Sequence, residues 1–141
     1  MWDGDYDATR HHNARRAIAT HVHDSLLSSL SDFNQTYPLL FNLLARVQQM
    51  CVELVQRRRS PRRGAHFTRE GLARTANLYQ TLEIRGRQLQ SECVQLIQEY
   101  AANPSITSVP SILSTVELHH EWYNFTQAMV QKFDQSTFLH Q

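Results

Sequence analysis

Histidine is the residue type in this sequence that most invites a chemical role, with eight copies in 141 residues. They include the close sets His11-His12, His21-x-His23 and His119-His120. Two imidazoles on one helix bind one metal ion when they lie three or four residues apart, since only that spacing places both on one face. The sets here have other spacings, and Asn124 stands where a zinc-protease helix needs its second histidine. The spacing therefore predicts no metal site and no cofactor.

Sequence signatures of enzymatic catalysis are also missing. The four glycines are far apart, so there is no nucleophile elbow, no glycine loop for a phosphate and no dinucleotide fingerprint. Cys51 and Cys93 both fall on apolar positions of expected helices, where a thiol acts as a small hydrophobic side chain. We therefore expect a protein that is not an enzyme and has no catalytic residues.

A short basic segment is the one local sequence suited to a charged partner. It comprises Arg57, Arg58, Arg59, Arg62 and Arg63 around Ser60-Pro61. Its guanidinium groups suit phosphates or the acidic groove of a nuclear-import receptor, but a solvated loop that binds nothing has the same composition. No aromatic residue interleaves the arginines, which weakens the case for stacking on nucleic-acid bases. Ser60 is a candidate phosphorylation site, because a phosphate there would pair with the neighbouring arginines.

The composition favours a single soluble helical domain over residues 1–141. Hydrophobic residues make up 41% of the chain, and only four glycines and four prolines interrupt long stretches of helix-forming residues. The acidic N-terminus does not resemble a secretory signal, and no apolar run reaches the roughly 18 residues of a membrane span. We therefore expect an intracellular protein of the cytoplasm or nucleus, with a flexible acidic N-terminus at 1–7 and a flexible tail at 135–141.

Apolar residues spaced three and four apart predict four helices, over 8–33, 38–59, 68–102 and 111–134. A turn is predicted at 34–38, because proline disfavours helix in the preceding residue and suits the first position of a new helix. The basic loop at 60–66 and a connection around Pro104 separate the remaining helices. Short connections favour antiparallel neighbours, so the pattern predicts an all-α fold, an antiparallel four-helix bundle.

The third predicted helix has the heptad pattern of a coiled coil. One row consists of Leu72, Tyr79, Gly86, Cys93 and Tyr100, and its companion row of Thr75, Leu82, Leu89 and Leu96. Gly86 in mid-helix indicates either a closely approaching helix or aromatic ring, or a kink. Because this helix is expected to be much longer than the second, part of its heptad face should stay uncovered and bind a partner or a second copy.

Two sets of residues form the partner-binding hypothesis. The first set is the aromatic stripe of the fourth helix, for which core packing is the competing interpretation, and the second set lies on the heptad helix. The first set comprises Leu118, Trp122, Phe125 and Met129, and the second comprises Leu82, Leu89 and Leu96. The sequence is interpreted as a non-enzymatic interaction subunit or adaptor that joins a homo-oligomer or a larger complex, with no small-molecule substrate. The alternative is a nucleic-acid-associated regulatory protein that acts through the basic segment 57–63.

Overall fold

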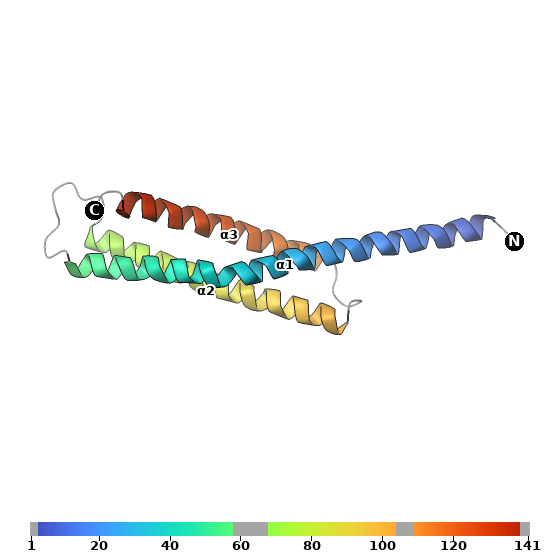
Figure 1. Cartoon of the computed structure of the whole chain (residues 1–141), viewed down its shortest axis with the longest axis horizontal. Helices are drawn as coiled ribbons and strands as arrows, with labels where there is room; N and C mark the ends of the chain where they lie inside the picture. Colours follow the sequence, from blue (N-terminus) through green and yellow to red (C-terminus); the bar gives the residue numbers. More distant parts are fainter. Residues whose placement is uncertain (1–2, 58–67, 104–108, 139–141) are drawn as a thin grey trace.

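The computed structural model describes residues 3–57, 68–103 and 109–138, and side chains within 8–57, 68–103 and 109–134. These residues form three α-helices and contain no strand: α1 (Asp3–Arg57), α2 (Arg69–Ala102) and α3 (Val109–Phe138). The predicted all-α class is therefore confirmed. α1 and α3 run in one direction and α2 runs antiparallel to both (Figure 1). Helix extends into both terminal segments, 1–7 and 135–141, that the sequence analysis set apart as flexible ends.

The predicted turn at 34–38 is wrong, because α1 continues through Pro38. A proline in a helix cannot donate to the carbonyl four residues earlier, here that of Asn34, which makes the position costly. Pro38 is exposed, so its ring enters solvent instead of the core. The buried positions Tyr37, Leu40 and Leu44 run in phase through this point. Packing of one uninterrupted face thus outweighs the local cost, and the described chain has three helices where four were predicted.

The core is a long seam between the helices that divides into two clusters. The larger cluster includes Leu44, Val47 and Cys51 of α1 together with Tyr79 and Leu89 of α2 and Trp122 and Phe133 of α3. The smaller one joins Leu27, Leu30, Cys93 and Ile112 near the connection between α2 and α3. The heptad row of α2 is buried as predicted at Leu72, Tyr79, Gly86 and Cys93.

The start of α2 follows the sequence prediction closely. Thr68 is the N-cap, and its hydroxyl accepts a hydrogen bond of 3.0 Å from the backbone N–H of Gly71. Such a bond satisfies one of the N–H groups that have no partner in the first turn of a helix. At the other end, the backbone N–H of Asn103 donates to the carbonyl of Glu99. α2 is thus a separate helix that begins and ends where its residues indicate.

Gly86 lies where an aromatic ring meets the α2 backbone. A Cβ atom at this position would overlap the indole ring of Trp122 and would come within 2.8 Å of Cε1 of Phe41. Glycine is thus the residue that admits the ring. Of the two interpretations of Gly86, close approach is the one the structure supports.

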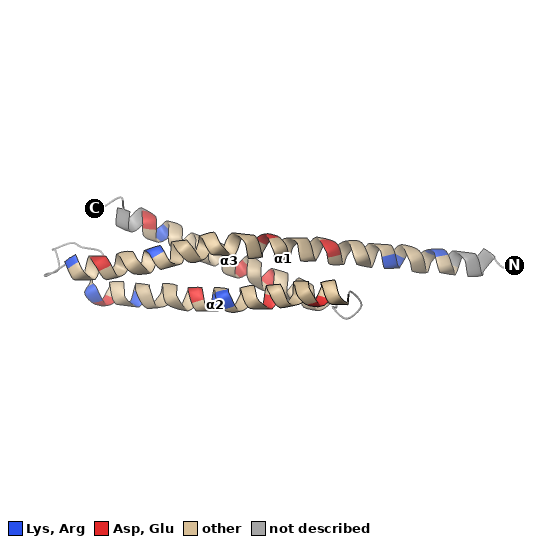
Figure 2. Ribbon diagram, turned by 60° about the horizontal axis from the view of Figure 1, so that its bottom comes forward, with Lys and Arg blue, Asp and Glu red and all other residues tan. Residues whose placement is uncertain are grey.

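α1 is much longer than the bundle it belongs to. The end of α2 meets α1 at Asp24, whose carboxylate accepts a hydrogen bond of 2.7 Å from the hydroxyl of Tyr100. N-terminal to His23, which still contacts Tyr100, α1 projects past α2 and α3 and has no other described helix beside it (Figures 1 and 2). All side chains of residues 8–21, here called the overhang, are exposed. The unequal helix lengths predicted that part of the heptad helix, now α2, would stay uncovered. The projecting part lies on α1 instead, because the predicted helices 8–33 and 38–59 form one continuous helix.

Candidate interaction surface

An aromatic cluster holds the three helices together at the middle of the bundle. The ring of Tyr37 stacks on His119 and meets Trp122 edge to face, with a centroid distance of 5.2 Å in each case. The indole N–H of Trp122 donates to the backbone carbonyl of Leu82 at 3.1 Å, which links α3 to α2. The Arg87 guanidinium lies 4.7 Å from the ring centre of Phe41 and covers the edge of the cluster. This cluster fixes the position of α3 on the other two helices.

His119 is the buried histidine of this cluster. Its side chain is fully buried, and neither ring nitrogen forms a hydrogen bond. Burial lowers the pKa of His119 to about 4, because the imidazolium loses its hydration. The backbone carbonyl of Leu89 acts in the opposite direction without reaching hydrogen-bond geometry. At neutral pH His119 is therefore an uncharged core residue.

The two cysteines and Tyr79 are likewise packing residues. Burial raises the pKa of the Cys51 and Cys93 thiols to about 11, so thiolate is scarce at neutral pH. The Cys93 thiol donates to the Leu30 carbonyl at 2.9 Å. Burial also raises the pKa of Tyr79 to about 12, and its hydroxyl donates to the Met129 carbonyl at 2.6 Å. As expected from the sequence, both thiols lie in the core.

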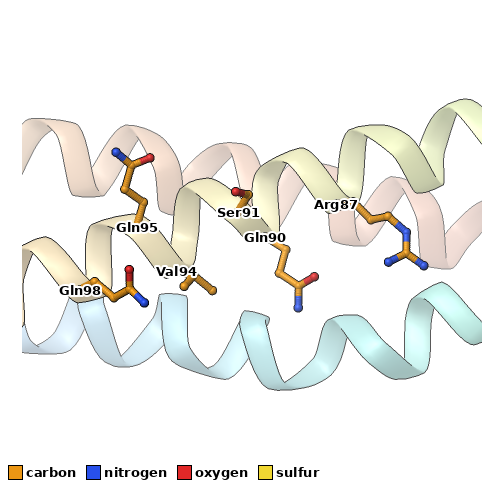
Figure 3. Close-up of a pocket in the computed structure, with 6 residues that line it drawn as sticks. All are labelled: Arg87, Gln90, Ser91, Val94, Gln95 and Gln98. Atoms are coloured by element: carbon orange, nitrogen blue, oxygen red, sulfur yellow. The ribbon is translucent and has the colours of Figure 1, made fainter.

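The shallow grooves on the surface of the described residues include the following two. One runs along α2 and is lined by Arg87, Gln90, Ser91, Val94, Gln95 and Gln98, whose polar side chains spread along the helix (Figure 3). The other lies between α1 and α3, where Asp32, His120 and Tyr123 contribute its polar groups. Within the described ranges no three His, Cys, Asp or Glu side chains come together as a metal site.

Three of the exposed large apolar side chains lie at the edge of the contact between α2 and α3. Trp122 and Met129 of α3 face α2 through their hydrogen bonds to Leu82 and Tyr79. Leu118 and Phe125 lie one helical turn from Trp122, and Leu78 lies one turn from Leu82, so all three border this contact. Their exposed fractions are 37%, 51% and 39% respectively. We call Leu78, Leu118 and Phe125 the α2–α3 face.

The charges of the overhang and of the α2–α3 face differ in sign. The overhang carries Arg10, Arg15 and Arg16 and no acidic residue, whereas Asp3, Asp5 and Asp7 lie directly before it on the same helix. Its apolar side includes Ala14 and Ile18, and Ile18 is 64% exposed. The α3 edge of the α2–α3 face carries Glu117 and Glu121, and residues 109–131 contain no Lys or Arg. The α2 edge is mixed in charge, with Arg85 and Glu92 exposed.

The structure separates the residues of the partner-binding hypothesis into two groups. Leu82, Leu89 and Trp122 are buried within the chain, and Leu96 and Met129 are half-buried. Leu118 and Phe125 are exposed. Arg57 is exposed at the end of α1, whereas Arg58, Arg59, Ser60, Arg62 and Arg63 lie outside the described residues. The overhang was not among the predicted binding residues, although a helix-forming stretch with arginines and no acidic residue marks it in the sequence.

Comparison of the chain with protein-family models, with curated proteins and with solved structures found no match. A search of the described helices for one long and apolar enough to cross a membrane also found none. The assignment of a function therefore depends on the surfaces themselves.

Proposed function

We propose that this chain is a non-enzymatic interaction subunit, which joins a homo-oligomer or a larger complex through helix packing. The observation that carries the proposal is the overhang, a helical segment of α1 whose side chains at 8–21 are all exposed. Isolated helices of this length are marginal in water, because helix stability in proteins comes mostly from packing of an apolar face. A helix that continues far beyond its own bundle is best explained by a partner that packs on it.

The chemistry of the described residues supports binding over catalysis. The buried titratable groups with shifted pKa values, His119, Cys51, Cys93 and Tyr79, are packed in the core and line neither of the two grooves described above. Exposed Ile18 and Phe125 instead provide the large apolar side chains that stabilise protein interfaces.

Site-specific photo-cross-linking in the native cell tests the proposal. A photoreactive amino acid at position 18 should form cross-links to protein, either to a second copy or to another chain. The same amino acid in place of Gln88, an exposed residue on the outer side of α2, is the matched control. Equal cross-linking at both positions, or none at position 18, would contradict the proposed role.

A further inference from the structure

We propose that the groove between α1 and α3 binds an arginine side chain of a partner protein. The inference rests on the proposed function and names the group by which the partner is recognised. The groove has a volume of about 330 Å³ and lies between residues 29–36 of α1 and 116–123 of α3. This space admits a side chain that ends in a guanidinium group.

The polar side chains that α1 places in the groove are hydrogen-bond acceptors. The carboxylate of Asp32 is exposed, and no hydrogen bond or ion pair joins it to another described residue. The hydroxyl of Ser29 donates to the backbone carbonyl one turn earlier at 3.2 Å, and the hydroxyl of Thr36 does the same at 2.8 Å. Because each hydroxyl has a single hydrogen, both offer only lone pairs to a ligand. A ligand that fits the groove must therefore bring the donors.

Aromatic rings line the same groove. Phe33 and Tyr123 are half-buried there, with ring centres 6.1 Å apart and ring planes inclined at 54°. The ring of His120 meets Phe33 edge to face at 6.0 Å. A guanidinium group is planar and weakly hydrated, stacks on aromatic rings and forms two parallel hydrogen bonds with a carboxylate. Rings beside an unpaired carboxylate therefore favour arginine over lysine.

The charges of the two helices favour a cation in this groove. Residues 17–45 of α1 and 109–131 of α3 contain no Lys or Arg. The acidic residues of these two segments are Asp24, Asp32, Glu117 and Glu121. Figure 2 accordingly shows red and no blue positions along the middle of α1. A surface with charges of one sign attracts the opposite charge, here that of a guanidinium group.

The position of the groove on α1 indicates that the arginine belongs to a protein. Positions 18, 22, 25, 29, 32 and 36 are three or four residues apart, so they lie on one side of α1. Ile18 and Asp32 are about 20 Å apart along this side, at about 1.5 Å per residue. A partner that packs on Ile18 and continues along α1 therefore reaches the groove. A shallow groove also leaves much of a ligand uncovered, whereas pockets for free small molecules bury most of the ligand surface.

NMR titration of the full-length chain with N-acetyl-arginine amide tests the recognised group. The amide signals of residues 29–36 and 116–123 should shift, whereas those of residues 90–98 at the other groove should not. N-acetyl-citrulline amide has the same shape without the charge and should bind about tenfold more weakly. N-acetyl-lysine amide should bind several-fold more weakly, because an ammonium group does not stack flat on a ring.

Three variants test the role of the carboxylate. Asp32→Asn should weaken binding of the arginine probe by about tenfold, because it keeps the shape and removes the charge of the acceptor. Glu121→Gln is the matched control, since Glu121 is an exposed carboxylate of α3 that does not line the groove, and its affinity should change by less than twofold. Ser29→Lys should abolish binding, because its ammonium group lies one turn from Asp32. Circular dichroism should show an unchanged helix content in all three.

Equal binding of the arginine and citrulline probes would overturn the inference, and so would equal binding of the lysine probe. Asp32→Asn that binds the arginine probe as tightly as the wild type would also overturn it. Cross-links from position 18 to protein in cells would in each of these cases still support the proposed function. Absence of those cross-links would contradict the proposed function, whatever the probes bind.

Discussion

Gly86→Ala tests the packing of Trp122 against α2. In an exposed helix this substitution stabilises by about 1 kcal/mol, because alanine has the higher helix propensity. Here the new Cβ atom would overlap the indole of Trp122 and would approach Phe41 within 2.8 Å. Overpacking of this kind costs about 1–3 kcal/mol. A displaced indole would also lose its hydrogen bond to Leu82, which costs roughly another 1–3 kcal/mol when the donor stays buried. The net expectation is a loss of about 3 kcal/mol.

Urea denaturation followed by circular dichroism, at one low protein concentration, measures this free energy of unfolding. Gly71→Ala is the control within the same helix, because its Cβ atom would meet only the flexible hydroxyl of Thr68 at 3.1 Å. Its effect should be a stabilisation of no more than about 1 kcal/mol, because the gain in helix propensity is offset where the Thr68 hydroxyl shifts from its capping position. In a Trp122→Phe background the smaller ring should reduce the cost of Gly86→Ala, as a double-mutant cycle would reveal. If Gly86→Ala stabilises the chain, the ring does not approach the helix as described.

Four further predictions concern the core, the long helix, pH and the basic segment. Leu89→Ala should lower the free energy of unfolding by about 2–5 kcal/mol in urea denaturation, because Leu89 is fully buried; an unchanged midpoint would place it on the surface. Pro38→Ala should stabilise by about 1–3 kcal/mol in the same assay, because an exposed mid-helix proline gives way to an N–H donor; a loss would favour a turn at 34–38. The contribution of His119 to the free energy of unfolding should be constant well above pH 6.5 and should fall by about 3 kcal/mol towards pH 4. The reason is that the imidazole of the unfolded chain, with a pKa of 6.5, binds a proton at higher pH than the buried imidazole, with a pKa of about 4. His119→Leu should lack this part of the pH dependence. Replacing Arg57, Arg58 and Arg59 by alanine should barely change the melting temperature, because exposed charges contribute little to stability. If the wild type binds nucleic acid in a way that weakens steeply with salt, and this variant does not bind, the nucleic-acid alternative is favoured.

The heptad helix shows how much of the fold follows from periodicity. The residues that repeat every seven positions, Leu72, Tyr79, Gly86 and Cys93, are all buried. Periodicity identifies the buried side of a helix because packing against a neighbour requires one continuous apolar face. Periodicity also placed Trp122 and Leu118 in the same stripe. It could not show that Trp122 is buried and Leu118 exposed, because that difference depends on how α3 packs against α2.

The break predicted at Pro38 shows where local rules fail. A proline costs a fixed amount at one position, whereas Tyr37, Leu40 and Leu44 gain burial only if the helix continues in register. The sequence contained a signal for this outcome, because the apolar positions before and after Pro38 are in phase. Ile18 belongs to the same pattern and yet is exposed, because a pattern identifies an apolar side but not the length of the helices that cover it.

The exchange rates of the backbone amides in residues 8–21 test the central claim most directly. A partner that packs on the overhang, whether a second copy or another chain, covers it, so these amides should become protected as the concentration of that partner rises, while the buried part of α1 around Leu44 shows no change. Amides of the overhang that exchange at the same fast rate at every concentration, while those around Leu44 stay protected, would contradict the account.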